Sequence, residues 1–300
     1  MSFDFNLAFE FTCNKYNFRP CRLDNIIENN NCPANQILIG DSYVLYDIFF
    51  LILSVIVAIL FVVLLPCMKP YEVLYYNQRK ARGTWYWKSH LLISGIYLLI
   101  WGISVSVTSI YDNNQKFFIV LTGIFQNWAQ SILIFCALVD TLLIPQKLMQ
   151  KCWWHILVGV ITCIIGLVYL IELWLPTGVG LMFLGIVVPV GCSAFYFVSM
   201  IPVLIYRKEF LGLVYLLFFT IFNIGHHILN ITIHGLLCTK TTGYFSGSSL
   251  SVVIFAFYRI FVQLYFQRLK EAERFDGLTE KRRLSEELSN LPLPIEISDY

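Results

Sequence analysis

Two apolar stretches of the chain carry amide and imidazole side chains at helical spacing. They are Gln126, Asn127, Gln130 and Ser131 in the first stretch, and Asn223, His226, His227 and Asn230 in the second. Residues four or seven apart share one face of a helix, so each stretch has a polar face. Two polar faces at similar depth predict an interhelical hydrogen-bond network or a hydrated pocket. The pocket hypothesis places a small ligand among Gln126, Asn127, Gln130, His227 and Asn230.

Four charged residues lie within apolar stretches. Asp47 and Glu172 lie within about a turn of the outer boundary, which leaves Asp140 near the end of 117–144 and Arg259 inside 250–266. A charge in the membrane is costly, so it is usually paired or functional. Both residues approach the same side of the membrane, which predicts an Asp140–Arg259 pair. The alternative is that Arg259 alone extends toward the membrane surface.

Histidines and an acid raise the alternative of a metal-dependent hydrolase within the membrane. The available ligands are His90, His226, His227, His234 and Asp140. His226 follows Leu211 by 15 residues, or about 22 Å along a helix, whereas His90 lies at the inner edge. One ion with bonds of about 2 Å cannot gather both histidines. We therefore expect no metal site, no catalytic residue and no cofactor.

Long apolar segments must position these side chains. The chain is 58% apolar and only 13% charged, against about 25% charged in a soluble domain. A membrane-spanning helix needs about 20 apolar residues. Seven segments meet this need, at 43–65, 91–111, 117–144, 156–175, 181–206, 211–237 and 250–266. The sequence therefore predicts an all-α membrane protein, a bundle of seven helices surrounded by the lipid bilayer.

Basic residues predict the orientation of this bundle. Fifteen of the 21 Lys and Arg residues fall in loops on one side, five fall on the other, and Arg259 lies within a span. Loops rich in Lys and Arg stay in the cytoplasm, so the C-terminus is expected inside and the N-terminus outside. The predicted organisation is an outer tail 1–42, a bundle 43–267 and a cytoplasmic tail 268–300. The net charge of +2 gives no reason to expect nucleic acid as a partner.

Cysteines agree with this topology. Cys13, Cys21, Cys32 and Cys238 all fall on the predicted outer side, where disulfides form. Four cysteines allow three pairings, of which we favour Cys32–Cys238 with Cys13–Cys21. The other five cysteines are expected as free thiols.

Seven spans, an outer N-terminus and a basic inner face favour a receptor-like signalling protein, with the plasma membrane as its expected location and an endomembrane as the alternative. The segment 266–275 is expected to form a short helix along the inner membrane surface that ends near Gly277. Arg282-Arg283-Leu284-Ser285 matches a basophilic kinase site, which predicts phosphorylation of Ser285. The Asp-Arg-Tyr and Asn-Pro-x-x-Tyr signatures of rhodopsin-like receptors are missing. A membrane scaffold or trafficking role is the main alternative, and a channel, transporter or enzyme ranks behind it.

Several short motifs resemble the adipocyte-associated transmembrane protein family. They are Cys32 before Ile37-Leu38-Ile39-Gly40, Asp47 at the start of the first span, Glu172-Leu173-Trp174-Leu175-Pro176, Gly235-Leu236-Leu237-Cys238 and Phe255-Ala256. The similarity covers most of residues 32–266, but the C-terminal tail is short and the loops match poorly. The resemblance implies an orphan seven-span receptor-like protein, with a heterotrimeric G protein as an expected partner. It implies no cofactor and no ligand-contact residues.

Overall fold

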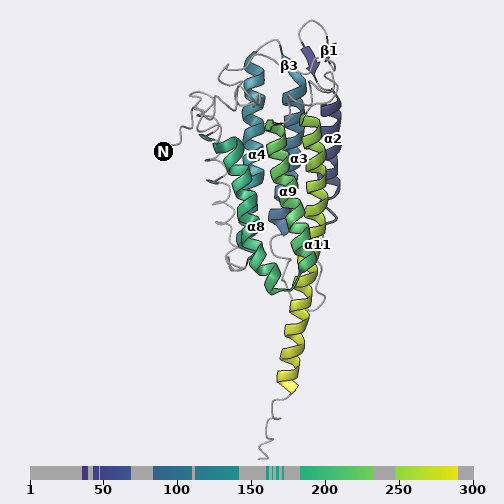
Figure 1. Ribbon diagram of the computed structural model, residues 1–300, viewed down its shortest axis with the longest axis vertical. Helices are drawn as coiled ribbons and strands as arrows, with labels where there is room; N and C mark the ends of the chain where they lie inside the picture. The colour runs from purple at the N-terminus through teal and green to yellow at the C-terminus, as the bar shows by residue number, and fades with distance from the viewer. Residues whose placement is uncertain are drawn as a thin grey trace, which may run out of the picture.

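The structure is a computed structural model, and the fold is mainly helical. It describes residues 36–39, 43–46, 48–68, 84–109, 112–141, 160–161, 164, 167–168, 171, 183–232 and 247–289. Its helices are α2 (Ile48–Val63), α3 (Thr84–Ser106), α4 (Asp112–Asp140), α8 (Val188–Tyr206), α9 (Phe210–Thr232) and α11 (Gly247–Ser289). A π-helical turn, η3 (Phe183–Val187), leads into α8. The helices run side by side as one elongated bundle (Figure 1).

Four of the described helical segments are long and apolar enough to cross a membrane. They are Phe117–Asp140, Gly185–Tyr206, Phe210–Leu229 and Gly247–Leu269, and they correspond to the predicted third, fifth, sixth and seventh spans. The first predicted span corresponds to α2, a shorter apolar helix, and the second to α3. These helices are consistent with an integral membrane protein.

α2 shows how the bundle meets its surroundings. Its inward face buries Phe50, Ser54, Val57, Ala58 and Phe61. Its outward face is also apolar, with exposed Phe49, Ile52, Ile56, Ile59 and Val63. A helix that is apolar on all sides belongs either in a protein core or in a membrane. Because one side of α2 is exposed, a core is ruled out and the membrane is the remaining environment. The fourth predicted span follows the same rule where it is described, since Val160, Ile164, Leu167, Val168 and Ile171 are helical and exposed.

The described fold is helical as predicted, with one small sheet at an end of the bundle. Strands β1 (Gln36–Ile39), β2 (Tyr43–Tyr46) and β3 (Val107–Ser109) form a small antiparallel sheet in that order. Tyr43 pairs with Ile39 on one side and with Ser109 on the other. The predicted spans 43–65 and 91–111 are therefore too long at this end. β-branched and aromatic residues suit a strand wherever a neighbouring strand satisfies the backbone, and here one does.

α11 corrects a second prediction. The helix is continuous over 43 residues, so no separate helix 266–275 exists and no end occurs near Gly277. It projects out of the bundle, at the end opposite the sheet (Figure 1). The projecting part is rich in Glu, Lys, Arg and Leu, and Arg268 pairs with Glu271 at 2.9 Å. Strong helix formers and such pairs offset the roughly 1 kcal/mol that an interior glycine costs.

The connection between α8 and α9 is only three residues long, and its backbone explains how. Lys208 adopts a left-handed conformation, with φ of 57°. Its N–H donates to Ile205 O at 3.0 Å, and Glu209 N–H donates to Leu204 O at 2.9 Å. This is a Schellman cap, built on a lysine where glycine is usual. The cap turns the chain sharply and places α9 against α8.

Close packing of α2 on α3 depends on a glycine. A methyl group at Gly102 would lie 2.9 Å from Ser54 Cβ, closer than carbon atoms approach. We expect Gly102→Ala to lower the free energy of unfolding by about 1–3 kcal/mol, because the two helices must separate. The matched control is Gly191→Ala on α8, where a methyl group meets nothing within 4 Å. That variant is expected to gain up to about 1 kcal/mol from helix propensity.

Thermal unfolding of the purified variants in detergent measures both changes. Equal effects of the two substitutions would contradict the close α2–α3 contact.

Candidate functional site

The centre of the candidate site is a pair of amide side chains, one on α4 and one on α9. Gln130 Nε2 donates to Asn223 Oδ1 at 3.3 Å, and Asn223 Nδ2 donates to Gln130 Oε1 at 3.0 Å. Gln130 is 2% exposed and Asn223 is fully buried. Each amide satisfies the other, so the pair joins the two helices without leaving polar atoms unpaired.

The pair extends to a third helix through Ser193 on α8. Asn223 Nδ2 donates to Ser193 Oγ at 2.6 Å, while Ser193 Oγ lies 2.9 Å from Pro189 O and 3.5 Å from Gln130 Oε1. Ser193 is fully buried. The serine therefore connects α8 to the amide pair at the depth of Gln130.

His227 on α9 joins the same network from the other side. Gln130 Nε2 lies 3.2 Å from His227 Nε2, and Gln126 Nε2 lies 3.2 Å from His227 Nδ1. A neutral imidazole donates from one nitrogen and accepts at the other, so the two glutamines cannot both donate to it. Gln130 is held by Asn223, whereas Gln126 is only half-buried and has room to turn its amide. We infer that Gln130 donates to Nε2 and that Nδ1–H donates to the Gln126 carbonyl.

His226, next to His227 on α9, makes a separate set of hydrogen bonds with two more helices. Tyr97 OH on α3 lies 3.1 Å from His226 Nε2, and His226 Nδ1 lies 3.0 Å from Ser251 O on α11. The His226 and His227 rings are 4.9 Å apart between centroids. Ser251 Oγ also lies 2.8 Å from His226 Nδ1, yet it donates to the His226 carbonyl, and both residues are fully buried. This serine–histidine contact fastens α11 to α9.

One residue of the predicted ligand site, Asn127, does not join this network, and another, Asn230, is not tested. Asn127 is buried, but its Nδ2 donates to Gly123 O of its own helix at 3.0 Å. Asn230 lies in α9, but its side chain is outside the described part of the chain. Gln126, Gln130 and His227 are brought together as the spacing predicts.

Sequence reasoning missed Ser193, Tyr97 and Ser251. Each lies in a different helix. Tyr97 has Ser94 three residues before it and Ser104 seven after it, and Ser251 has Ser248 three before it, so helical spacing could have marked both. Ser193 has only Tyr196 at such spacing, and the packing of the helices identifies its role.

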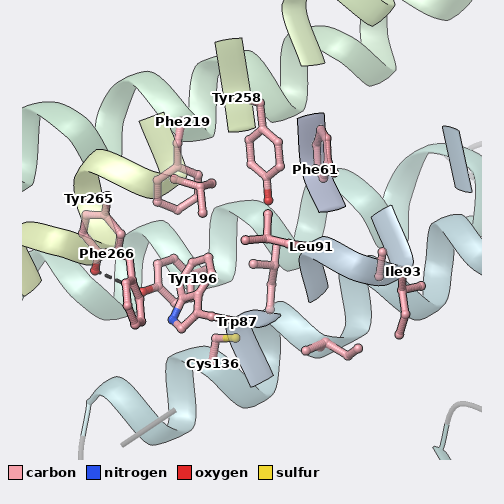
Figure 2. Close-up of a cluster of buried hydrophobic side chains, with 14 of the residues drawn as sticks. Phe61, Trp87, Leu91, Ile93, Cys136, Tyr196, Phe219, Tyr258, Tyr265 and Phe266 are labelled. Atoms are coloured by element: carbon pink, nitrogen blue, oxygen red, sulfur yellow. Dashed lines mark hydrogen bonds between the residues drawn. The ribbon is translucent and has the colours of Figure 1, made fainter. Parts of the chain in front are cut away.

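A second buried cluster surrounds Asp140 at the end of α4. Asp140 Oδ2 accepts from Trp87 Nε1 at 3.0 Å and from Tyr196 OH at 2.9 Å. The Tyr196 and Tyr265 hydroxyls are 3.0 Å apart, and Figure 2 shows Trp87 packed beside them. Because Tyr196 donates its one proton to Asp140, Tyr265 must donate to Tyr196. Aromatic donors from two helices, α3 and α8, therefore bond to a single carboxylate on α4, and Tyr265 on α11 bonds to one of these donors.

The predicted Asp140–Arg259 pair is not formed. Arg259 is fully buried on α11, where its Nη1 donates to Gln263 Oε1 at 3.1 Å. Its guanidinium carbon lies 5.9 Å from the centre of the Phe61 ring on α2. His90, also fully buried, bonds to neither charge: its Nδ1 lies 2.6 Å from Ala129 O, and its Nε2 contacts Tyr258 OH. Arg259 thus faces α2, while Asp140 is engaged by α3 and α8.

The residues that the structure describes do not form a metal-binding site. No group of three or more His, Cys, Asp or Glu side chains converges there. His90, His226 and His227 each bond to other side chains or carbonyls. What the arrangement offers is amide, imidazole and hydroxyl groups that donate and accept hydrogen bonds.

Cys67, Cys136 and Cys192 are free thiols, as predicted. The disulfide candidates Cys13, Cys21, Cys32 and Cys238 lie outside the described residues.

The fold and its buried polar network define a helical protein suited to the membrane. No protein-family model, curated protein or solved structure matches the chain. The similarity to the adipocyte-associated transmembrane protein family therefore stays a prediction.

Proposed function

We propose that this chain is a receptor-like membrane protein with seven spans, its N-terminus outside and its C-terminus in the cytoplasm. Four long apolar helices, the flanking α2 and α3, and the helical residues between 160 and 171 supply segments for seven spans. The distribution of Lys and Arg supports the orientation. The plasma membrane is the proposed location.

The observation that carries the proposal is the network centred on Gln130, Asn223 and His227. Through Ser193 it connects α4, α8 and α9. The ring of His226, which contacts that of His227, bonds in turn to α3 and α11. Buried networks of this kind are strong when satisfied and costly when a member is lost. A ligand shifts a bundle only if it binds one packing better than another. A ligand that binds one of these two adjoining sets of hydrogen bonds can therefore favour one packing of five helices over another.

The chemistry of these residues favours an uncharged polar ligand. Gln126, Gln130 and His227 offer amide and imidazole groups, which both donate and accept. Gln126 is the half-buried member, so it is the first that a ligand would meet. Asn127 and Asn230 remain part of the proposed ligand site from sequence spacing.

A nucleotide-exchange assay tests the proposal, using purified protein in lipid nanodiscs and a panel of heterotrimeric G proteins. We expect nucleotide exchange above background with at least one G protein. The exchange rate should change about tenfold in Gln130→Leu and in His227→Leu, because a bias of about 1.4 kcal/mol between two packings has that effect. The matched control is Gln267→Leu on the exposed side of α11, which should behave like the unmodified chain. If exchange stays at background with every G protein, the proposed coupling to G proteins is wrong.

The projecting part of α11 favours a second candidate, a membrane scaffold or trafficking protein. Residues 270–289 extend about 30 Å beyond the last apolar turn by helical rise. Arg282, Arg283 and the proposed phosphorylation site Ser285 lie on this segment. If a chain truncated after Leu269 changes its location in cells while the assay stays at background, the scaffold is favoured.

A further inference from the structure

Arg259 has more hydrogen-bond donors than its surroundings satisfy. The side chain is fully buried, and Nη1 alone has a hydrogen bond, to Gln263 one turn further along α11. Nε and Nη2 are buried and have no partner, and the same holds for Gln263 Nε2. A buried unpaired charge lowers the stability of a protein strongly, so such a group is rarely left without a partner.

The unsatisfied donors share one location. Gln263 Oε1 accepts from Arg259, so the amide nitrogen of Gln263 lies beside the guanidinium. Both residues belong to the side of α11 that packs on α2, where Arg259 lies over the Phe61 ring. Nε–H and Nη2–H of arginine form a planar fork that matches two oxygens of one anion. The amide of Gln263 adds a third donor group to the fork.

The occupant should be an oxyanion, because every unsatisfied group is a donor and one carries a positive charge. Among the described residues, the single ion pair is Arg268–Glu271, so no described carboxylate neutralises Arg259. Asp140 is engaged by Trp87 and Tyr196 instead. The neutralising charge must then come from outside the described bundle.

The two helices at this location both have a lipid-facing side. Ile260, next to Arg259, is 42% exposed, and Val62, next to Phe61 on α2, is 48% exposed. Arg259 itself lies on the buried side of α11. Arg259 lies within the last four turns of the apolar part of α11, which ends at Leu269.

We propose that Arg259 and Gln263 form a binding site for a phosphate oxyanion at the seam of α2 and α11. Either a phospholipid headgroup or free phosphate presents this chemistry. The site is separate from the His227 network and does not depend on receptor function.

Thermal unfolding of the full chain in a maltoside detergent, which contains no phosphate, tests the site, with two additions as probes. They are phosphatidic acid and inorganic phosphate, and the detergent alone is the reference. We expect phosphatidic acid or inorganic phosphate to raise Tm by about 3 °C, and the probe that does so identifies the source. Arg259→Gln and Gln263→Leu should abolish or reduce this rise.

The matched control is Arg268→Gln, which removes the same charge from an exposed position on the same helix. It should keep the full rise. If Arg259→Gln keeps the rise, or if Arg268→Gln loses it equally, the buried site is excluded. No rise with either probe would also overturn the proposal. If Arg259→Gln fails to fold, Gln263→Leu tests the site by itself, because it leaves the charge of Arg259 in place. An unchanged rise in Tm in Gln263→Leu would then contradict the site.

Discussion

Trp87→Ala is expected to lower the free energy of unfolding by about 3–5 kcal/mol, the largest effect of any single substitution proposed for this chain. Trp87 is fully buried. Its ring meets Tyr196 at 5.3 Å and Phe219 at 6.2 Å between centroids, and its Nε1 donates to Asp140. Alanine removes this packing and also takes a donor from a buried carboxylate. Tm of the purified protein in detergent measures the loss.

Trp85 provides a matched control two residues earlier on α3. It is 68% exposed, so Trp85→Ala should change the free energy of unfolding by no more than about 0.5 kcal/mol. Trp87→Phe separates packing from hydrogen bonding, and we expect it to cost about 1–3 kcal/mol for the donor that Asp140 loses. Similar losses for Trp85→Ala and Trp87→Ala would mean that α3 does not present Trp87 to the bundle interior.

Gln130→Leu is expected to cost about 2 kcal/mol of stability, because Asn223 Oδ1 then loses its donor inside the bundle. His227 Nε2 loses its partner as well. Adding Asn223→Leu should cost much less than the sum of the two single changes, since an apolar pair leaves fewer polar atoms unsatisfied. A double-mutant cycle on Tm or on chemical unfolding measures this coupling.

Gln126→Leu is the control for this cycle. Gln126 is half-buried and makes one described contact, to His227, so its replacement should cost less than about 1 kcal/mol. If the stability losses of Gln130→Leu and Asn223→Leu simply add in the double variant, the two amides do not stabilise each other.

The polar faces of the sequence predicted the centre of the site well. Gln130, Asn223 and His227 meet because each lies at helical spacing with other polar residues, and a helix must turn such a face away from lipid. The same argument failed for Asn127, which is buried but bonds to its own helix. Spacing identifies the polar face of a helix. Local packing decides whether a side chain on that face bonds to a neighbouring helix or to the backbone of its own helix.

Charge pairing was predictable only in part. Asp140 and Arg259 are both buried, as intramembrane charges at these positions should be. Their partners were not predictable, because Trp87 and Tyr196 reach Asp140 from helices distant in sequence. Proximity to the same membrane side does not determine which faces of two helices meet.

The sequence by itself determined the membrane character, the positions of the apolar helices and the two polar faces. These follow from local composition and from the 3.6-residue period of a helix. Tertiary structure alone decided which partners Ser193, Tyr97 and Ser251 have and that β2 and β3 replace the ends of two predicted spans. It also left Arg259 with unsatisfied donors on the α2 side. The physical reason is that a hydrogen bond between helices depends on their rotation and depth, which only the packing of the whole bundle sets.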